Sequence, residues 1–213
     1  MELPSKKLER TLFKKGYISI YAVDEVGVGC LAGPVVACAV AIKNSFYKKH
    51  HKELKKLRES KLLSAPQRAL FAEKLLKEKD LVFAIASCDP KTIDRLNIYH
   101  AARRAMREAI SKLTTKKSQL TTKTIVLVDG KTKIKDVKME QLPIVQGDRK
   151  VFAIACASII AKVHRDGLMK KFAQKYPDYG FEKHMGYGTK VHQNALNKHG
   201  PCPIHRRSFR LIY

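Results

Sequence analysis

Four carboxylates in this sequence stand at the ends of apolar runs that have the character of β-strands or short apolar patches. Asp24 and Glu25 close the run YAV, Asp129 closes TIVLV, and Asp148 follows the patch LPIV. Open α/β sheets place their sites at strand ends, where loops converge, so we expect the four acids to form one cluster. Carboxylates at that density raise each other's pKa unless cations neutralise them. Because the set contains neither His nor Cys, the expected cations are Mg²⁺ or Mn²⁺.

Such a cluster predicts phosphodiester chemistry. Two ions about 3.5 to 4 Å apart can activate a water and stabilise the leaving oxygen of a phosphodiester. The predicted metal ligands and catalytic residues are therefore Asp24, Glu25, Asp129 and Asp148. Taken singly, Asp129 with Gly130 is also a frequent turn pair, and Asp148 can cap a following helix. Adjacent strand residues point to opposite faces, so Asp24 and Glu25 are expected to share a site only if the strand ends or bends between them.

A glycine turn, GVGCLAG, follows the Asp-Glu pair and allows such a bend. Its spacing is not GxGxxG, and the segment after it is β-branched rather than helical, which excludes a dinucleotide-binding loop. The backbone amides of Gly27 and Gly29 can still approach a sugar or a phosphate closely. The turn is therefore a candidate substrate-binding surface.

The charge balance favours a polyanionic partner. The chain has 43 Lys and Arg against 19 Asp and Glu, a formal net charge of +24, which attracts nucleic acid first and anionic membrane second. A solvated basic surface without a partner is the alternative. No apolar run approaches the roughly 18 to 20 residues of a membrane span, and the N-terminus lacks the apolar centre of a signal peptide, so no membrane association is expected. Five widely spaced cysteines without a CxxC pair favour a reduced, cytoplasmic setting.

Strands alternate with helices along the chain, which predicts an α/β fold in a single domain, residues 1–213. The strand–turn–strand opening predicts that part of the sheet is antiparallel. Strands are expected at 17–23, 34–42, 81–88 and 124–128. Helices are expected at 5–15, from Ser64, from about Asn97, at 151–172 and at 190–198. Residues 112–123 are expected to form a polar linker.

Six segments, taken in order, resemble bacterial ribonuclease HII from about Leu8 to Phe209. They are YAVDEVGVGCLAGPVV, ESKLLS, VLVDG, QGDRKVFAIACASIIAKVHRD, YPDYGFEKHMGYGTKVHQNAL and GPCPIHRRSF. The resemblance implies an RNase H-like fold, a mixed β-sheet flanked by helices, with a C-terminal helical and basic substrate-binding part at about 176–213. It implies a two-metal endonuclease that cuts RNA in RNA–DNA hybrids and 5′ of ribonucleotides embedded in duplex DNA, leaving 3′-hydroxyl and 5′-phosphate ends. The family's four acids fall on the four acids above, and its sugar-packing tyrosine falls on Tyr187.

Two positions depart from the family pattern. Val28 stands where the family usually has Arg or Lys between the glycines, so the turn looks like that of ribonuclease HIII. The substitution removes a charge-assisted phosphate bond worth about 1.5 to 3 kcal/mol, while the amides of Gly27 and Gly29 remain. Glu59 stands where Asp is commoner, and Lys61 in the same segment is a candidate phosphate contact.

The leading hypothesis is therefore an endonuclease acting on RNA–DNA hybrids and ribonucleotide-containing duplexes. One alternative is ribonuclease HIII-like activity on longer RNA tracts. The other is a non-catalytic basic nucleic-acid-binding protein, which is disfavoured because it has no use for carboxylates that repel phosphate. The absence of heptads and of an obvious apolar surface stripe predicts a monomer. A sliding-clamp partner stays open, although no docking motif supports it.

Overall fold

The computed structural model describes residues 3–49, 51–116 and 123–210. Its centre is a mixed sheet with the strand order β3-β2-β1-β4-β5. The strands are β1 (Ser19–Val26), β2 (Val35–Ile42), β3 (Leu81–Cys88), β4 (Thr124–Asp129) and β5 (Glu140–Ile144). β2 pairs antiparallel with β1 and β3, whereas β4 pairs parallel with β1 and β5. The predicted α/β fold with a partly antiparallel sheet is confirmed.

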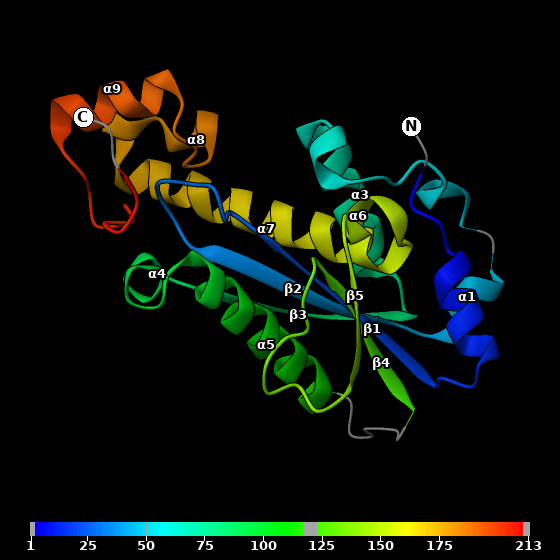
Figure 1. The fold of residues 1–213 in the computed structure, drawn as a ribbon. Coiled ribbons are helices and arrows are strands. Elements are labelled where there is room, and N and C mark those ends of the chain that lie inside the picture. Colours follow the sequence, from blue (N-terminus) through cyan, green and yellow to red (C-terminus); the bar gives the residue numbers. More distant parts are fainter. Residues whose placement is uncertain (1–2, 50, 117–122, 211–213) are drawn as a thin grey trace.

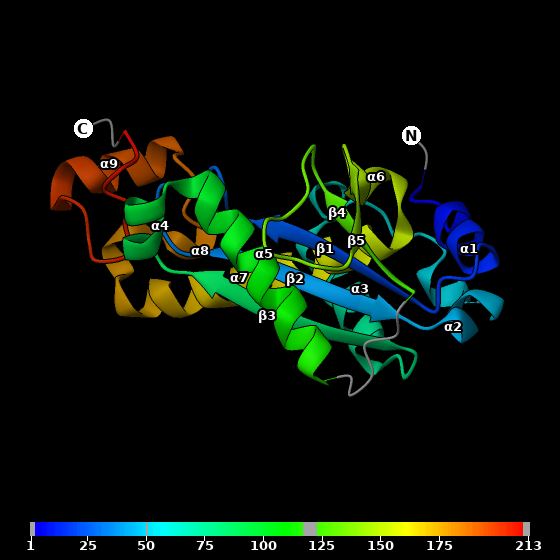
Figure 2. The ribbon, with the colours of Figure 1, turned by 60° about the horizontal axis from the view of Figure 1, so that its bottom comes forward.

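Helices cover both faces of the sheet, as Figures 1 and 2 show. The long helices α5 and α7 lie on opposite faces, each over its own apolar cluster, because every residue of the interior strand β2 is buried and needs cover on both sides. The first ten residues of α7, FAIACASIIA, are all buried. The helices are α1 (Lys7–Lys14), α2 (Asn44–Lys48), α3 (Ala65–Lys77), α4 (Pro90–Leu96), α5 (Ile98–Lys116), α6 (Gly147–Lys150), α7 (Phe152–Lys175), α8 (Phe181–His184) and α9 (Lys190–His199).

Local signals explain the starts of some helices, such as α3, and two segments differ from expectation. Ser64 begins α3 with a capping box that uses Gln67, as the SxxQ pattern favours. The predicted linker 112–123 is wrong over its first part, because α5 continues to Lys116 and buries Leu113 completely; residues 117–122 lie outside the described residues. The patch 142–145 overlaps the edge strand β5, where Pro143 is tolerated.

The second half of α7 carries a C-terminal lobe, drawn in orange and red in Figure 1. This lobe contains α8, α9, the 3₁₀ turn Pro177–Tyr179 and the segment after α9. Its own apolar cluster includes Met169, Phe181 and Leu196, and Ala32 from the β1–β2 turn packs into that cluster. The predicted C-terminal helical extension is confirmed, and it contacts the glycine turn directly.

The described part of the chain contains no helix with the length and apolar character needed to cross a membrane. All five cysteines are buried free thiols. Their side chains pack as small apolar groups.

Candidate active site

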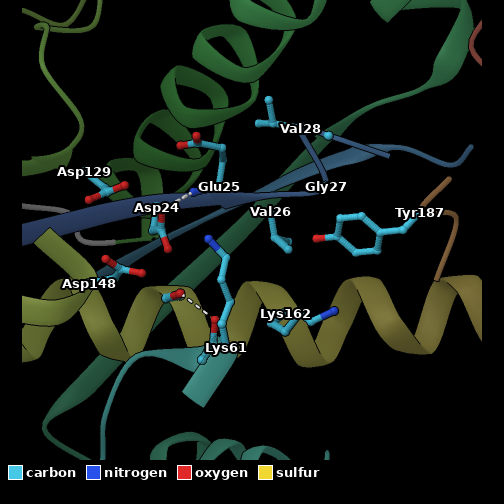
Figure 3. Close-up of a pocket in the computed structure, with 13 residues that line it drawn as sticks. Asp24, Glu25, Val26, Gly27, Val28, Lys61, Asp129, Asp148, Lys162 and Tyr187 are labelled. Atoms are coloured by element: carbon cyan, nitrogen blue, oxygen red, sulfur yellow. Dashed lines mark hydrogen bonds between the residues drawn. The ribbon is translucent and has the colours of Figure 1, made fainter. Parts of the chain in front are cut away.

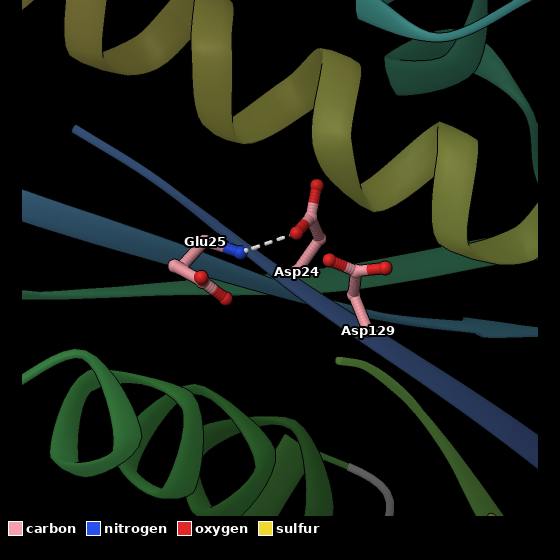
Figure 4. A group of neighbouring side chains, drawn as sticks. All are labelled: Asp24, Glu25 and Asp129. Carbon is pink, nitrogen blue, oxygen red and sulfur yellow. Dashed lines mark hydrogen bonds between the residues drawn. The ribbon is translucent and has the colours of Figure 1, made fainter. Parts of the chain in front are cut away.

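Three acids converge at one end of the sheet. Asp24, Glu25 and Asp129 each offer a carboxylate oxygen, and these oxygens lie within 4.8 Å of one another (Figure 4). Among the described residues, no other group of three or more His, Cys, Asp or Glu side chains has this geometry. Asp148 lies outside that triplet but lines the same pocket and contributes to the electrostatics of Asp24.

The pairing of β1 explains how neighbouring strand residues share the site. β4 pairs with β1 only as far as Val23, opposite Val128, whereas β2 pairs with β1 through to Val26. The edge of β1 that faces β4 is therefore open beside Asp24 and Glu25. Asp24 points towards α7 and Glu25 towards α5, and Asp129 ends β4 next to this open edge (Figure 4). The prediction that β1 ends or bends between the two acids is wrong, because β1 stays regular through both of them. The two acids share the site because both lie beside the unpaired edge of β1.

Asp148 reaches the pocket on the short helix α6. The amide of Gly147 donates to Asp129 Oδ1 at 2.7 Å, which ties the start of α6 to the end of β4. A Cβ on Gly147 would lie 2.5 Å from Ile154 Cδ1, so a larger residue would require the Ile154 side chain to move. The N-cap of α6 is Gln146, so helix capping does not account for Asp148.

Glu59 holds the other side of α6. Its carboxylate is buried and accepts from Arg149 Nε at 2.5 Å. Arg149 directly follows Asp148, so this ion pair fixes the helix turn that carries Asp148. The unusual Glu at this position therefore has a structural partner.

Burial and mutual repulsion make these carboxylates hard to ionise without cations. Burial, followed by Glu25 and Asp129, raises the pKa of Asp24 well above its usual range. Burial and then Asp129 raise the pKa of Glu25 to about 7, against the opposing effect of Arg103 and Lys61. The pKa of Asp148 is raised by burial and then by Asp129. Converging oxygen donors that repel one another fit a site for hard divalent cations such as Mg²⁺ or Mn²⁺.

A cavity of about 320 Å³ unites the acids with the other predicted site residues. The glycine turn lines it with Gly27, Val28 and Gly29, and Lys61 and Tyr187 line it as well. Figure 3 shows the Lys61 amine directed towards the acids and the Tyr187 ring directed along the pocket towards the turn. All nine predicted site residues thus line one cavity.

Two of the three glycines of the turn, Gly27 and Gly29, have different surroundings. Gly27 has φ +94°, and a Cβ there would lie 2.2 Å from Arg165 Nε. Gly29 has no atom within 4 Å of the position of a Cβ. Packing therefore requires Gly27, whereas Gly29 borders open space that a ligand can enter.

Sequence reasoning missed three polar side chains of the same cavity. Ser60 and Ser158 share a hydrogen bond of 3.0 Å, and Lys162 lies with them at the cavity wall. Lys162 is ion-paired to Asp166 at 2.7 Å, and its amine is 5.9 Å from the centroid of the Tyr187 ring. The four-residue spacing of Ser158 and Lys162 on one helix face was the available signal.

Known proteins are similar to this chain in both sequence and fold. A family model described as ribonuclease HII matches residues 22–212. Ribonuclease HII of Caldicellulosiruptor saccharolyticus is 43% identical over 203 residues, which is 95% of this chain and 92% of that protein. Ribonuclease HII of Bacillus licheniformis is 45% identical over 201 residues, which is 94% of this chain and 73% of that protein.

Solved structures give the same fold. Ribonuclease H2 from Pyrococcus horikoshii OT3 superposes with a TM-score of 0.70 at 24% identity, covering 91% of this chain and 94% of that chain. A chain of the PCNA:RNase HII complex from Archaeoglobus fulgidus gives 0.70 at 23% identity, covering 91% and 96%. Bst-RNase HIII in complex with Mn²⁺ gives 0.63 at 16% identity, covering 89% and 65%.

These structural likenesses place the chain in the class of proteins with an RNase H-like fold, in agreement with its mixed five-stranded sheet. The extensive match to bacterial sequences narrows the class further. The chain belongs to the ribonuclease HII family. It is therefore an RNase H-type endonuclease, and the non-catalytic alternative is wrong.

Proposed function

We propose that this protein hydrolyses the RNA strand of RNA–DNA hybrids and cuts on the 5′ side of ribonucleotides embedded in duplex DNA. The products are 3′-hydroxyl and 5′-phosphate ends, which suit the excision of ribonucleotides from DNA. The observation that carries this proposal is one cavity that joins an oxygen-only acid cluster to a glycine turn and an exposed tyrosine. The relatives named ribonuclease HII support it.

Two Mg²⁺ or Mn²⁺ ions are the proposed cofactors, held by the candidate catalytic acids Asp24, Glu25, Asp129 and Asp148. When bound, such ions activate a water and stabilise the leaving oxygen. The protein's own cations then serve the substrate: Lys61 and Lys162 lie in the cavity and can take non-bridging phosphate oxygens. Tyr187, with 38% of its surface exposed, offers a ring for the neighbouring sugar.

The glycine turn is the proposed ribose sensor. Open space at Gly29 lets a ribose approach the backbone, where an amide can donate to the 2′-hydroxyl. Val28, 38% exposed, adds an apolar side chain where the family usually has a cation. Val28 favours the second candidate function, a ribonuclease HIII-like preference for longer RNA tracts.

The charge of the chain and its cysteines support the proposed binding partner and compartment. The net charge of +24 supports binding to the phosphate backbone of a duplex. We propose that the protein acts in the cytoplasm as a monomer, and the buried free thiols support a reducing compartment. The archaeal complex of RNase HII with PCNA suggests that this protein, too, can bind a sliding clamp. Gel filtration of the protein alone and with a clamp distinguishes a free monomer from a clamp-bound one.

The test is cleavage of three end-labelled duplexes, each with and without Mg²⁺: one with a single ribonucleotide, one with a four-ribonucleotide tract, and one of DNA alone. We expect Mg²⁺-dependent cuts on the 5′ side of the ribonucleotide, and we expect the duplex of DNA alone to stay intact. Cutting of the tract alone would support the HIII-like candidate. Cutting of the all-DNA duplex at a similar rate would contradict both.

A further inference from the structure

A short segment of the C-terminal lobe, Cys202–Pro203–Ile204–His205–Arg206, lies against the β1–β2 turn; we call it the 202–206 strap. Its backbone pairs with the turn in both directions. The amide of Arg206 donates to the carbonyl of Leu31 at 2.9 Å, and the amide of Gly33 donates to the carbonyl of Ile204 at 2.8 Å. The strap and the turn therefore form one hydrogen-bonded unit, although about 170 residues separate them.

Arg206 fixes the orientation of the peptides in the glycine turn. Its guanidinium is fully buried and donates to three carbonyls: Gly27 at 2.6 Å, Val28 at 2.9 Å and Gly33 at 3.0 Å. The C=O and N–H of a trans peptide point in opposite directions. Because the carbonyls of Gly27 and Val28 face Arg206, the amides of Val28 and Gly29 face away from it, and both of these residues also line the cavity.

His205, the neighbour of Arg206, reaches Tyr187 through a second imidazole. Its Nδ1 accepts from the amide of Cys202 at 2.9 Å, the shorter of its two contacts with that residue, which leaves the proton on Nε2. Nε2 of His205 lies 2.9 Å from Nε2 of His192, to which it donates. His192 then carries its proton on Nδ1 and donates to the carbonyl of Tyr187 at 2.9 Å.

The histidine chain requires neutral imidazoles, and its surroundings keep them neutral. His205 and His192 are buried beside His184, which accepts from the amide of Gly186. Burial and then His192 lower the pKa of His205 to about 4, and Arg207 acts in the same direction. The chain is therefore intact at neutral pH.

Arg165, on α7, links the β1–β2 turn to the loop that carries Tyr187. Its buried guanidinium donates to the carbonyls of Ala32 and Pro34 in the turn and to the carbonyl of Met185, two residues before Tyr187. The turn and the Tyr187 loop, which both line the cavity, are thus held together by one side chain.

We propose that His205 and Arg206 are positioning residues for ribose selection: Arg206 orients the amides of the glycine turn, and His205 orients Tyr187 through His192. This inference rests on the proposed function, because it assigns both residues to the choice of a ribonucleotide in the same cavity. Neither side chain lines the acid cavity. Their loss is therefore expected to change which duplex is cut, and to spare the binding of metal.

The test compares Arg206→Lys, His205→Ala and His205→Gln with the wild type. Lysine keeps the charge but cannot span three carbonyls, and glutamine keeps a donor for His192. The control is Arg207→Lys, since Arg207 is exposed and bonds only to Pro201 through its side chain among the described contacts. Each variant receives a Mn²⁺ titration by calorimetry and kinetics on a long hybrid and on a duplex with one ribonucleotide.

We expect Arg206→Lys and His205→Ala to lower kcat/KM at the single ribonucleotide, relative to the long hybrid, by about tenfold, the scale of one lost hydrogen bond to a charged group. His205→Gln restores part of that ratio, and Mn²⁺ affinity stays as in the wild type. Because Arg206→Lys can also loosen the lobe, the rescue of His205→Ala by glutamine is the independent readout.

An unchanged ratio in Arg206→Lys and His205→Ala, with a wild type that cuts at the ribonucleotide, overturns this inference alone. An equal fall on both substrates, or a weaker Mn²⁺ site, also overturns it, since either marks a purely structural role. A wild type that fails to cut at any ribonucleotide overturns the proposed function and this inference with it.

Discussion

Replacing Gly27 and Gly29 of the turn by alanine, one at a time, distinguishes a glycine that the protein's packing requires from a glycine that borders open space. In Gly27→Ala the new methyl lies 2.2 Å from Arg165 Nε, at a φ of +94° that L-residues rarely adopt. In Gly29→Ala the methyl meets no protein atom within 4 Å. The same chemical change, two residues apart, therefore has opposite expected effects on stability and on substrate binding.

The cost of Gly27→Ala has two parts. The left-handed backbone costs about 1 to 2 kcal/mol for a residue with a Cβ. The methyl also displaces the buried Arg165 from its carbonyl partners, and leaving such a group unsatisfied costs about 1 to 3 kcal/mol. The free energy of unfolding is therefore expected to fall by about 2 to 5 kcal/mol, against a change within about 0.5 kcal/mol for Gly29→Ala.

Urea unfolding followed by circular dichroism measures the first effect, and Tm should fall by about 2 to 4 °C for each kcal/mol lost. Cleavage of a duplex with one ribonucleotide measures the second. Gly29→Ala should fold like the wild type and yet cut that duplex about tenfold more slowly, because the methyl fills the space a ribose needs. Equal stability of the two variants would refute the packing role of Gly27, and wild-type cleavage by Gly29→Ala would refute the open face of the turn.

Three further results are expected. Glu9 accepts from the amide of Ala153, and burial raises the pKa of its carboxyl to about 7. The folded protein therefore keeps the carboxyl proton of Glu9 to higher pH than the unfolded chain does. The free energy of unfolding is expected to fall as pH rises from about 4.5 to about 7. Glu9→Gln should flatten that part of the pH–stability curve, and an identical curve would contradict the assignment. Val28→Arg should raise the ratio of single-ribonucleotide to tract cleavage by about tenfold, by restoring a charge-assisted phosphate bond, whereas an unchanged ratio would make Val28 neutral. Duplex binding measured by fluorescence anisotropy should weaken at least about tenfold between about 50 and 200 mM salt, and a flat response would exclude the basic surface as the binding face.

The sequence was sufficient to predict the acids and most of the elements that hold them. Apolar runs that end in Asp or Glu marked β1 and β4, and Ser64 with Gln67 marked the start of α3. These signals are local, because a strand end or a helix cap depends on a few neighbouring residues.

What the sequence did not reveal depends on contacts between distant segments. Asp24 and Glu25 share a site because β4 stops pairing at Val23, a fact of register rather than of local bending. Arg165 and Arg206 belong to a chain so basic that their charges suggest a solvated surface, yet both are fully buried under the glycine turn. Their partners are backbone carbonyls, which leave no mark in the side-chain pattern.

The most direct test of the whole account is the loss of one cluster carboxylate. Asp129→Asn removes a charge from the cluster with little change in shape, and Asp136→Asn is the matched control, since Asp136 is exposed and paired with Arg107 at 2.7 Å. Both variants are assayed in Mg²⁺ for cleavage and for binding of a duplex that carries one ribonucleotide. We predict that Asp129→Asn binds this duplex as well as the wild type but cuts it at least about a hundredfold more slowly, while Asp136→Asn does both normally. Wild-type cleavage by Asp129→Asn would contradict the catalytic assignment of the acid cluster.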